Sequence, residues 1–405
     1  MRSLLGPAWF AAIIVSALGF SKSADVTYTR DLAHVFFAKC TPCHRPDGAA
    51  PFSLTTYDDV RRRAETIKSV VLDRSMPPYK ATSDYGRVTP ASPLTDDEAV
   101  LIQEWIRAGM AKGNASDMPP SPEFAPPPKA SIVLSQKGVT VRAEGPTYWQ
   151  TFVIPADITK KRGLIGFSVA PANPSVIRSV TIGIDTAGKG RAEDVKTPEP
   201  GYETAASFEA QTEEYIGVWT IGNGPWRLPD GVGKTLKPGD NLLVQVQYRP
   251  NGTAADGNFD LGLTFASGAY REVRQMNLGT RDIKVPILET PNFSDEETLS
   301  QGIQVVGVIP EARDYTVEVR LTATPPTDPA KTILRVYPWN VTYIGSYMFS
   351  QPPVLPKGTK LTASIHYQND LECHQNQNSY PRPVAYGPKI TDELFWVRVL
   401  YVPAP

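Results

Sequence analysis

Cysteine, histidine and long apolar runs are all scarce in this sequence. Its 405 residues include three cysteines and four histidines. Three cysteines are too few for the dense disulfide framework of a small secreted domain. The net charge of −1 gives no support for binding to nucleic acid or to an anionic membrane surface. After residue 20, no segment is apolar enough to predict a membrane span.

Proline, in contrast, is abundant, with 39 residues in the chain. Proline interrupts helices and is confined to turns and strand ends in sheets, so this content argues against a helix-rich fold. The length allows two or three domains, each with its own hydrophobic core.

The N-terminus has the pattern of a secretory signal peptide. Arg2 precedes an apolar run over residues 4–20, and small residues follow it. The pattern predicts a signal peptide over residues 1–24, cleaved within Gly19–Ala24, and a periplasmic or extracellular protein. Without cleavage the run is about long enough to cross a bilayer, so a retained membrane anchor stays open.

Two of the cysteines and one histidine form the motif Cys40-Thr41-Pro42-Cys43-His44. A thioredoxin-like dithiol would follow a strand and open a helix, but here a helical pattern precedes the motif. A zinc site would need a second Cys or His pair, which the surrounding sequence does not supply. CxxCH is the attachment motif of c-type haem. The motif therefore predicts one haem c, bound covalently by Cys40 and Cys43, with His44 as an axial ligand of the iron.

A second axial ligand is predicted in the loop that follows the next helix. Apolar residues recur at helical spacing over residues 57–74, and Met76 then stands before two prolines. We expect Met76 to be the ligand, because His/Met ligation is common in cytochromes c. Met110 is the alternative, at the end of a helix that begins with a capping box from Thr95 to Glu98.

The order helix, CxxCH, helix, methionine loop and helix resembles a class I cytochrome c over residues 25–114. The resemblance implies a small all-α domain with electron-transfer activity toward redox partner proteins. The run of basic residues at 61–63 is interpreted as a solvated helix face, with a docking patch for such a partner as the alternative.

A proline-rich linker over residues 115–129 is followed by a change of pattern. Short apolar runs with a period near two, separated by turn signals, predict an all-β region. The expected fold class is therefore multidomain: a small all-α class I cytochrome c domain, then two β-sandwiches over residues 130–290 and 291–405.

Several segments resemble bacterial c-type cytochromes fused to a copper type II, ascorbate-dependent monooxygenase-like module. These segments are ANPSVIRSVTIGI, GPWRLPDGVGKTLKPGDNLLVQVQYRPNG, LPKGTKLTASIHYQND and YGPKITDELF. The module is similar to peptidylglycine hydroxylating monooxygenase. The resemblance implies two β-sandwiches with one copper ion on each.

The residues that the family uses to bind copper are missing from this chain. Arg178 and Ser179 replace its His-His pair, and Gln247 and Arg249 replace its His-x-His. In the second sandwich, the segment Pro310-Glu311-Ala312-Arg313-Asp314 has no histidine, and Leu394 or Phe395 stands where a methionine is expected. Copper prefers imidazole and thioether ligands, and an arginine would repel it. Copper is therefore not expected.

Three further residues of the β region have metal-binding side chains. His366 is interpreted as a structural histidine within a strand. Cys373 and His374 form only a weak metal-binding pair, and Cys373 is interpreted as a free or intermolecular thiol.

The function predicted from the sequence is electron transfer by an exported mono-haem c-type cytochrome, with a copper-less β region as a binding or docking scaffold. On this interpretation the chain is an electron carrier and not an enzyme. Two alternatives remain: a copper monooxygenase supplied by its own haem, and an accessory subunit of a membrane electron-transfer complex.

Overall fold

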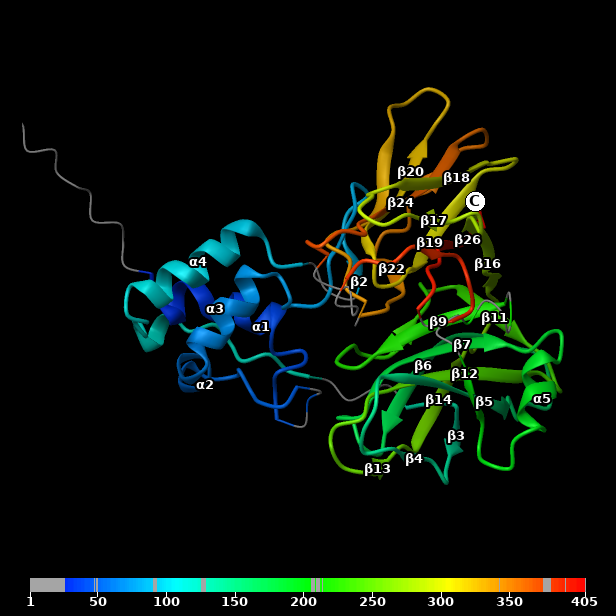
Figure 1. Cartoon of the computed structure of the whole chain (residues 1–405), viewed down its shortest axis with the longest axis horizontal. Coiled ribbons are helices and arrows are strands. Elements are labelled where there is room, and N and C mark those ends of the chain that lie inside the picture. The colour runs from blue at the N-terminus through cyan, green and yellow to red at the C-terminus, as the bar shows by residue number, and fades with distance from the viewer. Residues whose placement is uncertain are drawn as a thin grey trace, which may run out of the picture.

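The structure is a computed structural model of the whole chain, and it describes residues 26–46, 48, 50–89, 93–124, 129–204, 208, 212, 214–341, 343–373, 380–389 and 391–404. The predicted signal peptide (1–24), part of the predicted linker (125–128) and His374 lie outside the described residues. Within these residues, no helix is both long and apolar enough to cross a membrane. Figure 1 shows a group of short helices on one side of a larger β part.

The helices of the N-terminal segment pack around one small apolar core. They are η1 (Tyr28–Leu32), α1 (Ala33–Lys39), α2 (Tyr57–Arg62), α3 (Ala64–Leu72), α4 (Asp96–Arg107) and η2 (Ala115–Asp117). The predicted capping box of α4 is confirmed: the Glu98 amide donates to Thr95 Oγ1 at 3.1 Å, and the Thr95 amide donates to Glu98 Oε2 at 2.8 Å. We name this part, residues 26–76 and 93–117, the helical segment.

The predicted fold class is wrong, because residues 25–114 do not form a cytochrome-like all-α domain. The chain is mostly β, with 39% strand and 14% helix, arranged in small sheets. The strands β1 (Ala81–Thr82) and β2 (Val88–Thr89) lie between α3 and α4, and both pair with strands from the C-terminal third of the chain. Burial of Tyr79 and Val88 in a β core holds these residues in place. The helices are therefore short, and two β-strands separate α3 from α4 along the chain.

Two sheets share the first β core, and we call them the first sheet pair. One has the order β8-β5-β12-β7-β9, and the other has the order β15-β11-β6-β14-β3 with β10 beside β6. Their bounds are β3 (Ile132–Gln136), β5 (Tyr148–Pro155), β6 (Arg162–Pro171), β7 (Ile177–Ile184), β8 (Tyr202–Thr204), β9 (Tyr215–Thr220), β10 (Trp226–Arg227), β11 (Val232–Leu236), β12 (Asn241–Tyr248), β14 (Phe259–Phe265) and β15 (Arg271–Glu272).

Two further sheets share a second core, and we call them the second sheet pair. Their orders are β1-β21-β20-β24-β18 and β16-β26-β19-β22-β2, with β23 beside β19. Their remaining bounds are β16 (Arg274–Gly279), β18 (Asn292–Thr298), β19 (Ile303–Glu311), β20 (Thr316–Thr324), β21 (Lys331–Val336), β22 (Tyr347–Phe349), β23 (Val354–Leu355), β24 (Lys360–Tyr367) and β26 (Trp396–Pro403).

Smaller elements complete the β part. They are α5 (Lys189–Asp194) and two two-stranded sheets, which pair β4 (Thr140–Val141) with β13 (Ala255–Asp256) and β17 (Lys284–Val285) with β25 (Val384–Ala385).

The two sheet pairs are joined by buried contacts. Arg398 on β26 forms an ion pair with Glu311 on β19, with 2.6 Å between Nη1 and Oε2, and its guanidinium lies 3.7 Å from the ring centroid of Tyr215 on β9. The amide of Val218 on β9 donates to Ser346 Oγ at 2.7 Å. The first core also includes Met348 and other residues of the second pair. The sheet pairs are therefore packed directly against each other.

Candidate functional site: the Cys40–His44 turn

The CxxCH motif forms a tight turn at the C-terminal end of α1. The amides of Cys43 and His44 both donate to the carbonyl of Cys40, at 3.1 and 2.9 Å. The buried Thr41 donates its hydroxyl back to the carbonyl of Phe37 at 2.8 Å. These bonds place the two thiols and the imidazole of His44 on one short, hydrogen-bonded segment.

The imidazole of His44 is oriented by the segment that follows the turn. His44 Nδ1 lies 3.1 Å from the carbonyl oxygen of Phe52, and the two rings are 4.7 Å apart between centroids. Since a carbonyl oxygen only accepts, Nδ1 carries the proton and Nε2 presents its lone pair. Burial lowers the pKa of His44, with the Phe52 hydrogen bond opposing this effect. A neutral imidazole with a fixed Nδ1–H is the form that ligates a metal.

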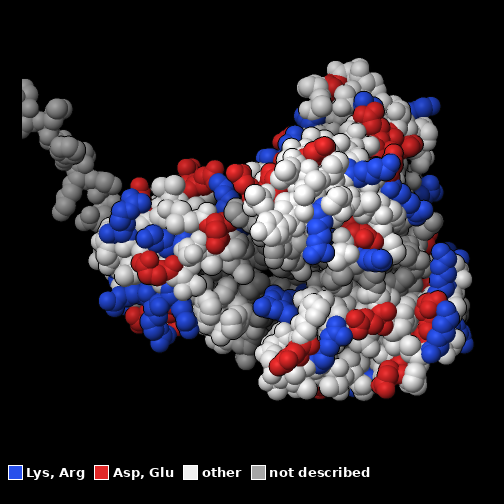
Figure 2. Space-filling model, viewed as in Figure 1, with Lys and Arg blue, Asp and Glu red and all other residues white. Residues whose placement is uncertain are grey.

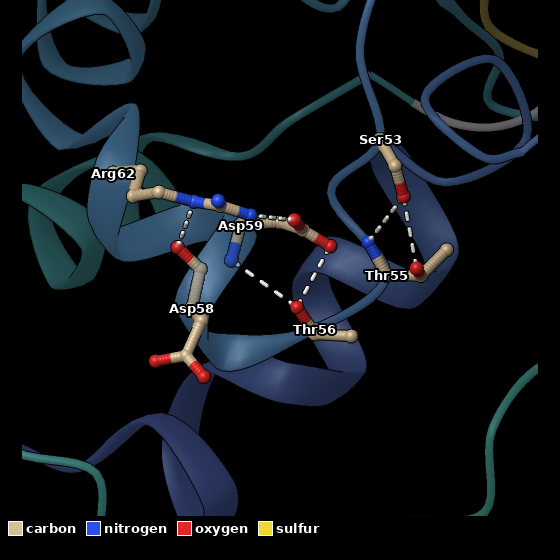
Figure 3. A network of polar contacts seen from close by, with 6 residues as sticks. All are labelled: Ser53, Thr55, Thr56, Asp58, Asp59 and Arg62. Carbon is tan, nitrogen blue, oxygen red and sulfur yellow. Dashed lines mark hydrogen bonds and ion pairs between the residues drawn. The ribbon is translucent and has the colours of Figure 1, made fainter.

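A network of polar contacts fixes the segment that carries Phe52 (Figure 3). Thr56 caps α2 by accepting from the Asp59 amide at 3.1 Å, and its hydroxyl donates to Asp59 Oδ2 at 2.7 Å. Arg62 donates to Asp59 Oδ1 at 2.7 Å and to the carbonyl of Asp58 at 3.3 Å.

Ser53 and Thr55 continue the network through a 2.9 Å contact between their hydroxyls. The amide of Leu54 donates to the His44 carbonyl at 2.9 Å. The start of α2 and the CxxCH turn are thus connected through residues 52–56.

The two thiols of the motif are protonated. Burial, together with Cys43 and Glu98 and opposed by Lys39, raises the pKa of Cys40 to about 12. Burial also raises the pKa of Cys43, and Arg45 opposes this effect. A nucleophilic cysteine of a redox dithiol is usually found at a helix N-terminus or beside a cation that lowers its pKa. Cys40 and Cys43 instead follow the C-terminal end of α1, a position that does not fit the nucleophilic cysteine of a redox dithiol. Two neutral thiols next to an oriented imidazole fit the covalent attachment of a c-type haem.

The two methionine candidates lie in different surroundings. Met76 follows α3, its amide donates to the carbonyl of Val70 at 3.0 Å, and its side chain is 43% exposed. Met110 packs against the core of the helical segment, and its carbonyl accepts from Tyr57 Oη at 2.8 Å. Of the predicted site residues, Cys40, Cys43 and His44 lie on one turn, while Met76 lies on a separate loop.

The Met76 loop is linked to the CxxCH turn through Tyr79. The hydroxyl of Tyr79 donates to the carbonyl of Lys39, the residue directly before Cys40. The ring of Tyr79 contacts the ring of Tyr343 edge-on, with 6.1 Å between centroids. Sequence reasoning missed both tyrosines, since neither belongs to a motif and their contact joins residues far apart in the chain.

The positions where the resembled family binds copper have other polar partners here. Ser179 on β7 and Gln247 on β12 are paired across two neighbouring strands, and Ser179 Oγ donates to Gln247 Oε1 at 3.0 Å. Arg178 is half-buried and Arg249 is exposed. The hydroxyl, amide and guanidinium groups at these positions are poor ligands for copper.

In the second sheet pair, the corresponding segment contains a buried arginine. Arg313 donates to the carbonyls of Lys389 and Asp392, and Leu394 and Phe395 are buried in or beside the core. His366 lies on β24 with its Nδ1 3.1 Å from Asn292 Oδ1. Cys373 is half-buried, and its thiol donates to the carbonyl of Asp314 at 3.8 Å. Within the described residues, no group of three or more His, Cys, Asp or Glu side chains is arranged to hold a metal ion.

Comparisons with known proteins do not assign the chain to a family. No family model matches the sequence, and no curated protein matches it. Among solved structures, the STIV MCP is 9% identical with a TM-score of 0.23, covering 68% of this chain and 93% of its own. A putative secreted protein from Eubacterium rectale is 12% identical with a TM-score of 0.20, covering 63% of this chain and 69% of its own. TM-scores this low support no argument about fold or function.

Proposed function

We propose that this chain is an exported c-type haem protein that transfers electrons to or from partner proteins. The observation that supports this proposal most strongly is the turn from Cys40 to His44. Its two neutral thiols and its imidazole, held at Nδ1 by the Phe52 carbonyl, are the donor set that a covalently bound haem requires. A bound haem would supply a one-electron couple.

The residues of the chain would have distinct tasks in this function. Cys40 and Cys43 would hold the haem covalently, and His44 Nε2 and Met76 would ligate the iron. Phe52 would keep the imidazole in the ligating tautomer through its carbonyl. Met76 is 43% exposed, so its side chain is not enclosed in the core of the helical segment.

The proposed partners are redox proteins of the periplasm or the extracellular space, including a membrane electron-transfer complex. The mixed surface charge is compatible with transient docking, since Lys and Arg alternate with Asp and Glu over the face in Figure 2. Arg61, Arg62 and Arg63 are all exposed at the end of α2, where basic side chains gather in the same view. They are a candidate docking patch for an acidic partner.

The β part is proposed to serve as a scaffold without catalytic copper. The hydrogen bond between Ser179 and Gln247 and the buried Arg313 support this proposal, because these groups stand at the positions where the resembled family has imidazoles.

The test of the proposed function is the haem content of the exported full-length protein. We expect one haem per chain that survives acid–acetone extraction, and loss of that haem on Cys40→Ala or Cys43→Ala. Cys373→Ala is the matched control and should keep the haem, since this third cysteine lies outside the motif. Complete extraction of the haem from the wild-type chain would contradict the proposal. Two copper ions per chain after dialysis against excess copper, with oxygen-dependent hydroxylation, would favour the monooxygenase instead.

A further inference from the structure

Two buried tyrosines connect the CxxCH turn to the β part. Tyr79 is 3% exposed and Tyr343 is 6% exposed. Tyr79 binds the Lys39 carbonyl directly before Cys40, and its ring meets the Tyr343 ring. The side chain of Asn223, in the loop after β9, holds the Tyr343 hydroxyl with contacts of 3.0 and 3.1 Å. One chain of contacts therefore runs from the haem-attachment turn to both sheet pairs.

The loop that carries Tyr343 is fixed independently of the tyrosine. The hydroxyl of Thr220 donates to the carbonyl of Ile344, and the amide of Val218 donates to Ser346 Oγ at 2.7 Å. Both donors belong to β9 of the first sheet pair. Since the loop is held at these two points, the position of the Tyr343 ring is set by the β part and not by the helical segment.

The motif cysteines also influence the pKa values of both phenols. Burial raises the pKa of Tyr79, with further contributions from Cys40 and Cys43. Burial raises the pKa of Tyr343 well above its usual value, and Tyr347, Cys43 and Tyr79 add to this effect, while Asn223 opposes it. Both phenols are therefore neutral at physiological pH, and they act as ring surfaces and hydrogen-bond donors.

We propose that Tyr79 and Tyr343 are positioning residues of the haem site, which shield the cysteine side of the Cys40–His44 turn from water and make the haem potential depend on the β part. This inference rests on the proposed function. Cys40 and Cys43 would hold the haem through thioether bonds, so two buried rings linked to this turn would limit the access of water to the bound group.

The expected consequence is a lower reduction potential of the haem when the ring of Tyr343 is removed. Ferric haem carries one more positive charge than ferrous haem, and water stabilises the more charged state. Tyr343→Ala would admit water beside the thioether bonds and favour the ferric form. We expect the equilibrium between the two forms to shift about tenfold, which is about 59 mV for a one-electron couple.

The experiment is a redox titration of the haem-containing full-length chain. The potential should fall in Tyr343→Ala and recover most of the change in Tyr343→Phe, which keeps the ring. Tyr380→Ala, at a position that is 75% exposed, is the matched control and should leave the potential unchanged. An unchanged potential in Tyr343→Ala, with full haem content, would overturn the inference. If that variant does not fold, Tyr343→Leu replaces it, with the same expected direction and the same refuting result.

A second measurement does not depend on haem. In the haem-free full-length chain with Cys373→Ser, Tyr343→Ala should speed alkylation of the motif thiols by N-ethylmaleimide about tenfold, because the reagent gains access to Cys43. Equal rates with and without the Tyr343 ring would contradict the shielding role. Absence of haem from the wild-type protein would defeat the proposed function, whereas an unchanged potential or an unchanged alkylation rate would defeat only this inference.

Discussion

Replacing Arg398 by Met is expected to lower the free energy of unfolding by about 3–5 kcal/mol. Arg398 is 1% exposed, and its Nη1 lies 2.6 Å from Glu311 Oε2. Removing the cation would leave the Glu311 carboxylate in a largely buried position without its charged partner, which is the costly way to break a buried ion pair. The contact of the guanidinium with the Tyr215 ring, at 3.7 Å, would be lost as well.

A second ion pair of nearly the same length provides the control. Arg335 Nη2 lies 2.7 Å from Glu318 Oε2, but the side chain of Arg335 is 38% exposed. Arg335→Met should therefore cost at most about 1 kcal/mol, because water screens the charges of an exposed pair. Urea unfolding followed by tryptophan fluorescence would measure both variants in the full-length chain, with the slope of the transition as a check on two-state behaviour.

The double variant Arg398→Met/Glu311→Leu separates the ion pair from the packing. Replacing both charges by apolar groups removes the unpaired carboxylate, so the double variant should recover most of the stability that Arg398→Met loses. The reasoning fails if Arg398→Met costs no more stability than Arg335→Met. It also fails if the double variant loses as much stability as Arg398→Met and the single variant Glu311→Leu lose together.

Three further predictions concern single side chains. Met76→Ala should remove the weak far-red absorption band of a sulfur–iron bond and lower the haem reduction potential. Met110→Ala should leave both the band and the potential unchanged. Loss of the band in Met110→Ala and its survival in Met76→Ala would assign the ligand to Met110. Thr95→Ala should lower the free energy of unfolding by about 1 kcal/mol through loss of the α4 cap, measured by urea unfolding, and an unchanged midpoint would show that the capping box contributes nothing. Burial raises the pKa of Asp314 from 3.8 to about 6, and Arg313 opposes this effect. The folded state therefore favours the protonated carboxyl group. The stability that this group contributes is complete below about pH 4 and is lost as the pH rises through about 6. Asp314→Asn should flatten the stability profile over that window, and a profile with the same slope in both proteins would refute the assignment.

Features encoded by neighbouring residues could be predicted from the sequence. The capping box of α4 was predicted correctly because Thr95 and Glu98 satisfy each other's backbone amides within one turn. The apolar stripe over residues 57–74 was also predicted correctly: Val60, Ile67 and Val71 are buried. The structure divides this stretch into α2 and α3 at Arg63.

Features that depend on distant partners could not be predicted. The strands β1 and β2 have two residues each, which is too short for any periodicity, and their partners β21 and β22 come far later in the chain. The fold class was wrong for this reason. The same limit applies to the site: the Cys40–His44 motif is contiguous, but Tyr79, Tyr343 and Asn223 meet only after the β part has folded.

The positions of β1 and β2 also bear on aggregation. Each is the outermost strand of its sheet: β1 lies beside β21, and β2 lies beside β22. An outermost strand that is removed leaves a row of unpaired backbone groups, which is a template for pairing with another chain. The stretch between Met76 and α4 therefore protects two open sheet edges of the C-terminal part. A fragment that begins after this stretch would expose both β21 and β22 to neighbouring molecules, so the stretch and the β part should be kept together in one soluble protein.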